Sequence, residues 1–153
     1  MQKIFVLYLS ILITLASSAQ KPETNKITLP NGWSLSPAGH GFLLGDLPLN
    51  MAVSPSERWI AVANSGESPH SVQLIDSRTE EILDNVRVPH CWVGLKFSAD
   101  EKNLYVAGGN DNWILKYVIK KNKLLLQDSI ILGDKWPVKI SPSGIDMDDQ
   151  KQL

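Results

Sequence analysis

The chain has 153 residues, of which 43% are hydrophobic, and its formal net charge is −1 at pH 7. This composition is typical of a globular domain and argues against an intrinsically disordered chain. Because no basic or acidic run is present, the sequence gives no sign of a nucleic-acid partner.

The first 19 residues have the three parts of a secretory signal. Lys3 provides a short basic region, Ile4 to Leu15 form an apolar stretch, and small residues lead up to Ala19. The apolar stretch is shorter than the roughly 20 residues that a membrane-spanning helix requires. We therefore predict a signal peptide over residues 1–19, cleaved after Ala19. Residues 20–153 contain no second apolar segment of that length, so the protein is expected to be secreted or periplasmic, with no membrane span after signal removal.

A repeat of about 44 residues follows the signal. Residues 51–63 align without gaps with residues 95–107, at an offset of 44. Farther along, residues 71–76 align with residues 113–118 at an offset of 42, so the second copy has lost two residues in a loop. A third copy begins near Gly144. Self-similarity at such a period indicates a repeat architecture.

Each copy is predicted to form four short strands, because β-branched and aromatic residues gather in runs that turn residues separate. In chain order the predicted strands are Leu49–Val53, Trp59–Ala63, Ser71–Asp76, Ile82–Val88, Gly94–Phe97, Asn103–Ala107, Trp113–Ile119 and Lys123–Ile131. Residues 60–63 and 104–107 are apolar throughout, so both faces of their sheets should be covered. The predicted fold class is all-β, with β-propeller blades of four antiparallel strands.

The offsets place one blade at about 48–90, a second at about 91–137, and the start of the next at about 138–153. Together they make an incomplete ring of about two blades plus the start of a third. Such a set would leave large apolar blade faces in water. The isolated chain is therefore expected to self-associate, or to be part of a longer protein.

The first copy carries three motifs that resemble those of a known repeat family. They are Val53-Ser54-Pro55-Ser56-Glu57, Ala61-Val62-Ala63-Asn64 and Val72-Gln73-Leu74-Ile75-Asp76. They resemble the YVTN-repeat β-propellers of the YncE type. The second copy diverges, since Gly108 and Val118 stand where the asparagine and the aspartate of this pattern fall. Asn110 and Asp111 are expected to supply those polar groups from the next turn.

Residues 29–50 also look like the N-terminal part of exported propellers that are joined to an alkaline-phosphatase-type phosphoesterase domain. The sequence itself carries nothing of a phosphoesterase metal site. This resemblance is specific for the fold and weak for function.

No catalytic, cofactor-binding or metal-ligating constellation is predicted. His40, His70 and His90 fall in separate loops without metal-ligand spacing and are interpreted as ordinary loop histidines. Cys91, the single cysteine, is predicted to be a buried and unreactive thiol. The acidic run at 146–149 lacks the glycine and the glutamate of a calcium loop, and is interpreted as a strand end and turn.

One loop is a candidate ligand site. Asn110, Asp111, Asn112 and Trp113 combine amide, carboxylate and indole groups that could bind a ligand at a propeller face. The alternative is a plain turn, in which glycine and asparagine supply positive φ angles and Trp113 begins the next strand.

Three functions remain open. The first is an exported, non-catalytic propeller segment that serves as a binding or scaffolding module for a protein or small ligand, as part of a longer protein and without a cofactor. The second is a fragment of a propeller hydrolase, either lactonase-like or the propeller half of a phosphoesterase fusion. The third is a small secreted adhesion or envelope protein that assembles blades between chains.

Overall fold

The computed structural model describes residues 27–36, 39, 41–134, 137 and 140–148. The predicted signal peptide, its cleavage site and His40 lie outside these residues. The chain divides into two compact units, Met1–Gly41 and Phe42–Leu153. Within the described residues, no helix has the length and apolar character needed to cross a bilayer.

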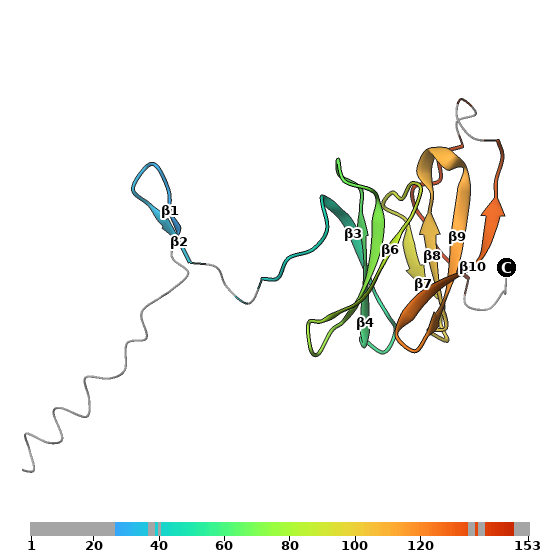
Figure 1. The fold of residues 1–153 in the computed structure, drawn as a ribbon, viewed down its shortest axis with the longest axis horizontal. Coiled ribbons are helices and arrows are strands. Elements are labelled where there is room, and N and C mark those ends of the chain that lie inside the picture. The colour runs from blue at the N-terminus through green and yellow to red at the C-terminus, as the bar shows by residue number, and fades with distance from the viewer. Residues whose placement is uncertain (1–26, 37–38, 40, 135–136, 138–139, 149–153) are drawn as a thin grey trace, which may run out of the picture. The chain divides into compact units, whose positions relative to one another are not determined.

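The N-terminal unit contains a short antiparallel hairpin of β1 (Ile27–Thr28) and β2 (Ser34–Leu35) (Figure 1). Its turn is closed by backbone hydrogen bonds, and Gly32 takes a positive φ of 80° there. Asn31 Oδ1 accepts a hydrogen bond of 3.0 Å from the backbone N–H of Trp33. The hairpin is absent from the predicted strands, because each strand has two exposed residues and no apolar run marks it.

The second unit is all-β and contains two antiparallel four-stranded sheets (Figure 1). The first sheet has the order β3 (Pro48–Val53), β4 (Trp59–Asn64), β5 (Ser71–Asp76) and β6 (Ile82–Arg87). The second sheet has the order β7 (Leu95–Phe97), β8 (Asn103–Ala107), β9 (Trp113–Lys120) and β10 (Lys123–Ile131). All eight predicted strands are confirmed, and each end lies within one residue of its prediction.

The turn between the first and second strands has the same conformation in both sheets, which explains why the sequence repeat is clearest there. Ser54 Oγ accepts a hydrogen bond of 3.1 Å from the backbone N–H of Trp59. At the matching place in the second sheet, Ser98 Oγ accepts one of 3.0 Å from the backbone N–H of Asn103. In both turns a glutamate takes the left-handed conformation, with φ angles of 59° and 58°. The two serines therefore define a turn, as the sequence indicates.

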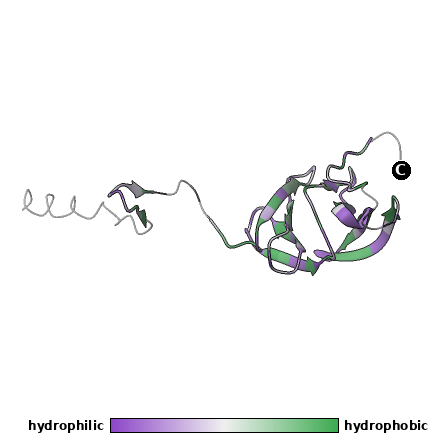
Figure 2. Ribbon diagram, turned by 90° about the horizontal axis from the view of Figure 1, so that it is seen from above, coloured by the Kyte–Doolittle hydropathy of each residue, from purple (hydrophilic) through white to green (hydrophobic). Residues whose placement is uncertain are grey.

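The hydrophobic core lies between the two sheets, which Figure 2 shows from above with hydrophobic segments in both. One face of the first sheet, called the packed face below, presents mainly small side chains to this core: Ala52, Trp59, Ala61, Ala63, Val72, Leu74 and Val86. The second sheet contributes larger side chains: Leu95, Phe97, Leu104, Val106, Leu115, Tyr117 and Leu124. Small side chains opposite large ones let the two sheets interdigitate closely.

A further segment lies against the second sheet beside β7. Lys96 Nζ forms an ion pair of 2.9 Å with Asp146 Oδ1. A Cβ atom on Gly94 would lie 2.7 Å from the carbonyl oxygen of Ser143 and 3.0 Å from Ile145. Residues 140–148 form no strand, since none of the described strands pairs with them.

Candidate functional site

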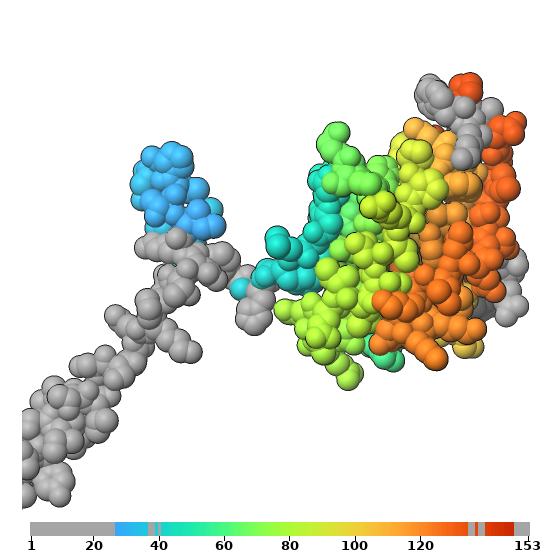
Figure 3. All heavy atoms as spheres, in the orientation of Figure 1, coloured from blue at the N-terminus to red at the C-terminus, as the bar shows by residue number. Residues whose placement is uncertain are grey.

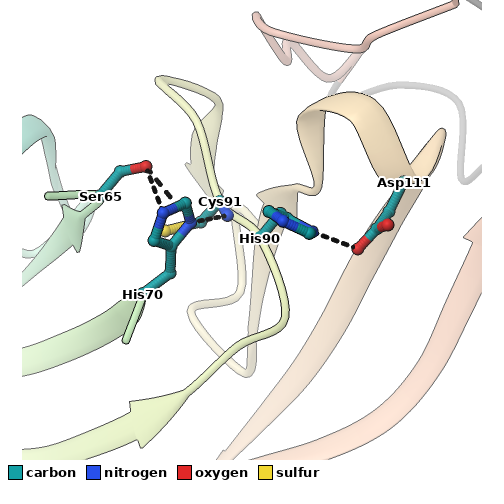
Figure 4. A network of polar contacts seen from close by, with 5 residues as sticks. All are labelled: Ser65, His70, His90, Cys91 and Asp111. Atoms are coloured by element: carbon teal, nitrogen blue, oxygen red, sulfur yellow. Dashed lines mark hydrogen bonds and ion pairs between the residues drawn. The ribbon is translucent and has the colours of Figure 1, made fainter. Parts of the chain in front are cut away.

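Three connections meet at one end of the two sheets, called the loop end below. They are residues 65–70 between β4 and β5, residues 88–94 between β6 and β7, and residues 108–112 between β8 and β9. In a sheet whose strands follow one another in sequence, alternate connections lie at the same end. This topology brings together His70, His90 and Asp111, one from each connection (Figure 4).

His70 lies between Ser65 and Cys91 (Figure 4). The backbone N–H of Cys91 donates a hydrogen bond of 3.3 Å to His70 Nδ1. Because that nitrogen is the acceptor, the neutral ring carries its proton on Nε2. Ser65 Oγ lies 3.3 Å from both ring nitrogens. His70 therefore ties the connection from β6 back to the loop between β4 and β5.

His90 bridges to the second sheet. Its Nδ1 lies 2.8 Å from Asp111 Oδ2. The Asp111 side chain is only 8% exposed, whereas the His90 side chain is 52% exposed. The two imidazole rings meet edge to face, with their centroids 5.5 Å apart. A series of contacts thus runs from Ser65, just after β4, through the two imidazole rings to Asp111, just before β9.

The thiol of Cys91 is buried, as predicted from the sequence. Its Sγ lies 3.3 Å from the carbonyl oxygen of Asn64 and 3.7 Å from that of Ser71. Burial raises the pKa of the Cys91 thiol to about 11, which keeps the sulfur protonated at neutral pH. The thiol is therefore a weak nucleophile.

The candidate ligand loop is a turn that also holds a distant segment. Residues Gly109–Asp111 form a 3-10 helix, and Asn112 ends it in the left-handed conformation, with a φ of 55°. The buried Asn112 side chain donates to the carbonyl oxygen of Asp134 and accepts a hydrogen bond of 2.8 Å from the backbone N–H of Ser141. Asn110 Oδ1 accepts one of 3.0 Å from the Ser141 hydroxyl.

Asn110 and Asp111 do not repeat the role of Asn64 in the first sheet. Asn64 Nδ2 donates to Ser71 and Gln73 of its own sheet, at 3.3 and 3.1 Å. By contrast, Asn110 and Asp111 contact residues outside the second sheet. The space that a side chain would need at Gly108 is filled by Trp113, whose Cδ1 would lie 1.9 Å from an added Cβ atom.

The network contains a serine, two imidazoles and a carboxylate, but these groups are not arranged as a Ser-His-Asp catalytic triad. Ser65 lies beside His70, whereas Asp111 contacts His90. In a Ser-His-Asp relay the carboxylate orients the same imidazole that takes the serine proton. Among the described residues, no group of three histidine, cysteine, aspartate or glutamate side chains is arranged to hold a metal ion.

This network is not evident from the sequence, in which the histidines stand in separate loops. His70 and His90 are separated by two strands, β5 and β6, so no short motif links them. Only the order of the strands along the chain could indicate that the two histidines lie close together. One histidine precedes β5 and the other follows β6, and in an antiparallel pair these two positions lie at the same end.

Two successive four-stranded antiparallel sheets, packed face to face, define the class of the protein as an incomplete all-β propeller. No family model matches the chain, and no curated protein matches it. The chain is similar to hydrazine synthase of Kuenenia stuttgartiensis, with a TM-score of 0.54 and 23% identity, over 69% of this chain and 27% of that one. That protein has β-propeller domains. The similarity supports the fold alone.

Proposed function

We propose that the chain is an exported, non-catalytic propeller segment that binds a protein or small ligand at the loop end. The observation that carries this proposal is the network of His70, His90 and Asp111, which joins three connections from both sheets. Side chains held in this way lose little further freedom when a partner binds, which lowers the entropic cost of association.

The residues at the surface of the loop end suit a polar or aromatic partner. The His90 imidazole is half exposed, and Asn110 and Trp113 are half-buried. Asp111 and Asn112 are buried and hold this surface from within. The imidazole and the amide offer hydrogen bonds to a partner, whereas the Trp113 side chain packs against the core and its indole nitrogen is buried.

The same geometry favours binding over catalysis. The raised pKa of Cys91 keeps its thiol protonated, and Ser65 and Asp111 contact different imidazoles. A nucleophile needs an adjacent base that a third group orients. We therefore prefer a binding or scaffolding module to the hydrolase alternative.

We further propose that the sheets are blades of the YVTN type. Asn64 is buried and joins β4 to β5 through Ser71 and Gln73. Asp76 Oδ1 accepts hydrogen bonds of 2.9 and 3.1 Å from the two backbone N–H groups of residues 78 and 79, and these bonds lower the pKa of Asp76. These contacts would explain why the motif has an asparagine and an aspartate at these two positions.

Photo-cross-linking tests the binding proposal. The full chain, carrying p-benzoylphenylalanine at position 110, is irradiated with envelope and extracellular fractions of the source cells. The matched control carries it at Asn122, a half-buried asparagine in the β9–β10 turn at the opposite end. We expect a discrete adduct from position 110 alone. Equal labelling from both positions, or none from either, contradicts a binding site at the loop end.

A turnover assay tests the non-catalytic proposal separately. Hydrolysis of p-nitrophenyl phosphate and of an aliphatic lactone is measured for the parent chain and for His70→Ala. We expect the same background rate from both. Turnover by the parent chain that His70→Ala abolishes would establish the hydrolase alternative instead.

A further inference from the structure

His70 takes part in a hydrogen bond that only its neutral form can make. The backbone N–H of Cys91 donates to His70 Nδ1 at 3.3 Å. A protonated imidazole carries a hydrogen on both nitrogens and has no acceptor left. Protonation of His70 would therefore set two donors against each other, the Cys91 N–H and the ring N–H. The arrangement in Figure 4 fits the neutral ring alone.

The segment that this bond holds is short and lies between two backbone anchors. The backbone N–H groups of Val88 and Trp92 donate hydrogen bonds of 3.0 and 3.1 Å, the first to the carbonyl oxygen of His70 and the second to the end of β8. Residues 89–91 lie between these anchors and include the half-exposed His90. Neither anchor uses a titratable group, so residues 89–91 can open locally while the sheets stay in place.

The second imidazole responds differently to acid. His90 Nδ1 lies 2.8 Å from Asp111 Oδ2, and a nitrogen that donates to a carboxylate can do so in the neutral and in the charged ring. The centroids of the two rings lie 5.5 Å apart, so two charged rings would repel each other. Acid therefore acts against the contact of His70 and leaves that of His90 intact.

Other charged or titratable groups lie on the elements around His70. They are Asp46, Glu67, Arg87, His90, Cys91 and Asp111. The backbone N–H of Ser68 donates to Asp46 Oδ2 at 2.9 Å and lowers the pKa of Asp46, so this carboxylate stays charged above pH 5. Burial raises the pKa of the Cys91 thiol to about 11 and keeps it neutral.

The remaining neighbours are either solvated or already engaged. Glu67 and Arg87 are exposed, and Figure 3 shows the loop between β4 and β5 at the surface of its unit, so solvent screens their charges. The Asp111 carboxylate contacts His90. Histidine is the side chain whose ordinary titration falls between pH 5 and 8, which makes the two imidazoles the groups that matter in this range.

We propose that His70 is a pH-sensitive latch, whose neutral ring holds residues 89–91 closed and whose protonation in acid releases them. This inference rests on the proposed binding function and names its regulation, because the released segment carries His90 of the loop-end surface. The open segment binds one proton more at His70 than the closed one does. By linkage, the closed form is favoured at high pH and is lost as the pH falls. A partner bound at the loop end is thus released in acid.

Labelling of Cys91 tests the latch, because its thiol is buried while residues 89–91 are closed. The parent chain, His70→Asn and His90→Asn are treated with 4,4′-dithiodipyridine at pH 7.5 and at pH 5. Each rate is divided by that of the same chain in urea at the same pH. Asparagine at position 70 offers an amide oxygen to the Cys91 N–H and does not titrate. His90→Asn is the matched control, which keeps His70 and removes the second imidazole.

We expect the normalised rate of the parent to rise about tenfold or more from pH 7.5 to pH 5, since the open fraction grows up to tenfold for each pH unit over which the open segment is protonated. His90→Asn should show the same rise, and His70→Asn should show none. A parent rate that does not rise overturns the latch. An equal rise in His70→Asn, which general acid unfolding would produce, also overturns it, and so does a rise that only His90→Asn removes.

The labelling involves no partner, so the latch is judged independently of the proposed binding site. The photo-cross-linked adduct from position 110 then tests the consequence for binding. We expect the adduct at pH 7.5 and its loss at pH 5. Equal yields at the two pH values overturn the release of a partner in acid. A chain whose Cys91 labelling responds to pH but which gives no adduct supports the latch and counts against the binding site alone.

Discussion

Leu74 lies at the centre of the packed face and is fully buried, so Leu74→Ala tests whether the two sheets form one cooperative unit. The substitution removes three carbon atoms, each worth about 0.8 kcal/mol of transfer free energy, or about 2.4 kcal/mol in all. Incomplete collapse around the cavity brings the expected loss of unfolding free energy to about 3 to 4 kcal/mol. Both sheets contact this cavity, so both should lose stability together.

Urea unfolding followed by tryptophan fluorescence measures this loss. With a slope of about 1.5 kcal/mol per molar urea, the midpoint should fall by about 2 M. Leu43→Ala is the control, because Leu43 is 91% exposed and its truncation should change stability by less than about 0.5 kcal/mol. A loss below about 1 kcal/mol for Leu74→Ala, or separate transitions for the two sheets, would refute a shared core. A variant without a folded baseline counts as a loss at least equal to the parent's stability.

Three other predictions concern single side chains. Gly108→Ala places a Cβ atom 1.9 Å from Trp113, so its thermal midpoint should fall, whereas Gly144→Ala meets nothing within 4 Å and should leave the midpoint unchanged. Hydrogen bonds from the Ser98 hydroxyl and from the turn that follows lower the pKa of Asp100 to about 2, below its ordinary 3.8. The stabilising effect of the Asp100 carboxylate is therefore present above pH 3.8 and is lost as the pH falls towards 2. Asp100→Asn should flatten that part of the stability profile, and an unchanged profile contradicts the assignment. At pH 8, Cys91 should react with a thiol reagent only after denaturant is added, and rapid labelling of the native chain would show that it is not buried.

The strands were predictable because their signals are local. Each run of β-branched and aromatic residues ends at a turn whose residues have a defined role, such as Ser54 and Ser98. The repeat offset adds a second, independent check on the register. The apolar runs at 60–63 and 104–107 indicate sheets with both faces covered, and Ala61, Ala63, Leu104 and Val106 do lie in the core between the two sheets.

The candidate site was predictable only in part. The sequence singled out the loop that begins at Asn110, and the structure shows that its buried Asn112 holds the segment around Ser141. That contact joins residues 29 apart without any shared periodicity. Likewise, the pairing of His70 with His90 depends on which connections share an end of the sheets. Contacts of this kind follow from topology, and patterns along the chain do not encode them.

Cys91 links the core to the loop end, which couples the packing of the sheets to the proposed binding surface. Its side chain belongs to the hydrophobic cluster between the sheets, whereas its backbone N–H fixes the His70 ring. His90 directly precedes Cys91, and its ring contacts Asp111 in the connection before β9. A partner at the proposed binding surface would therefore contact imidazoles that groups from both sheets hold in place.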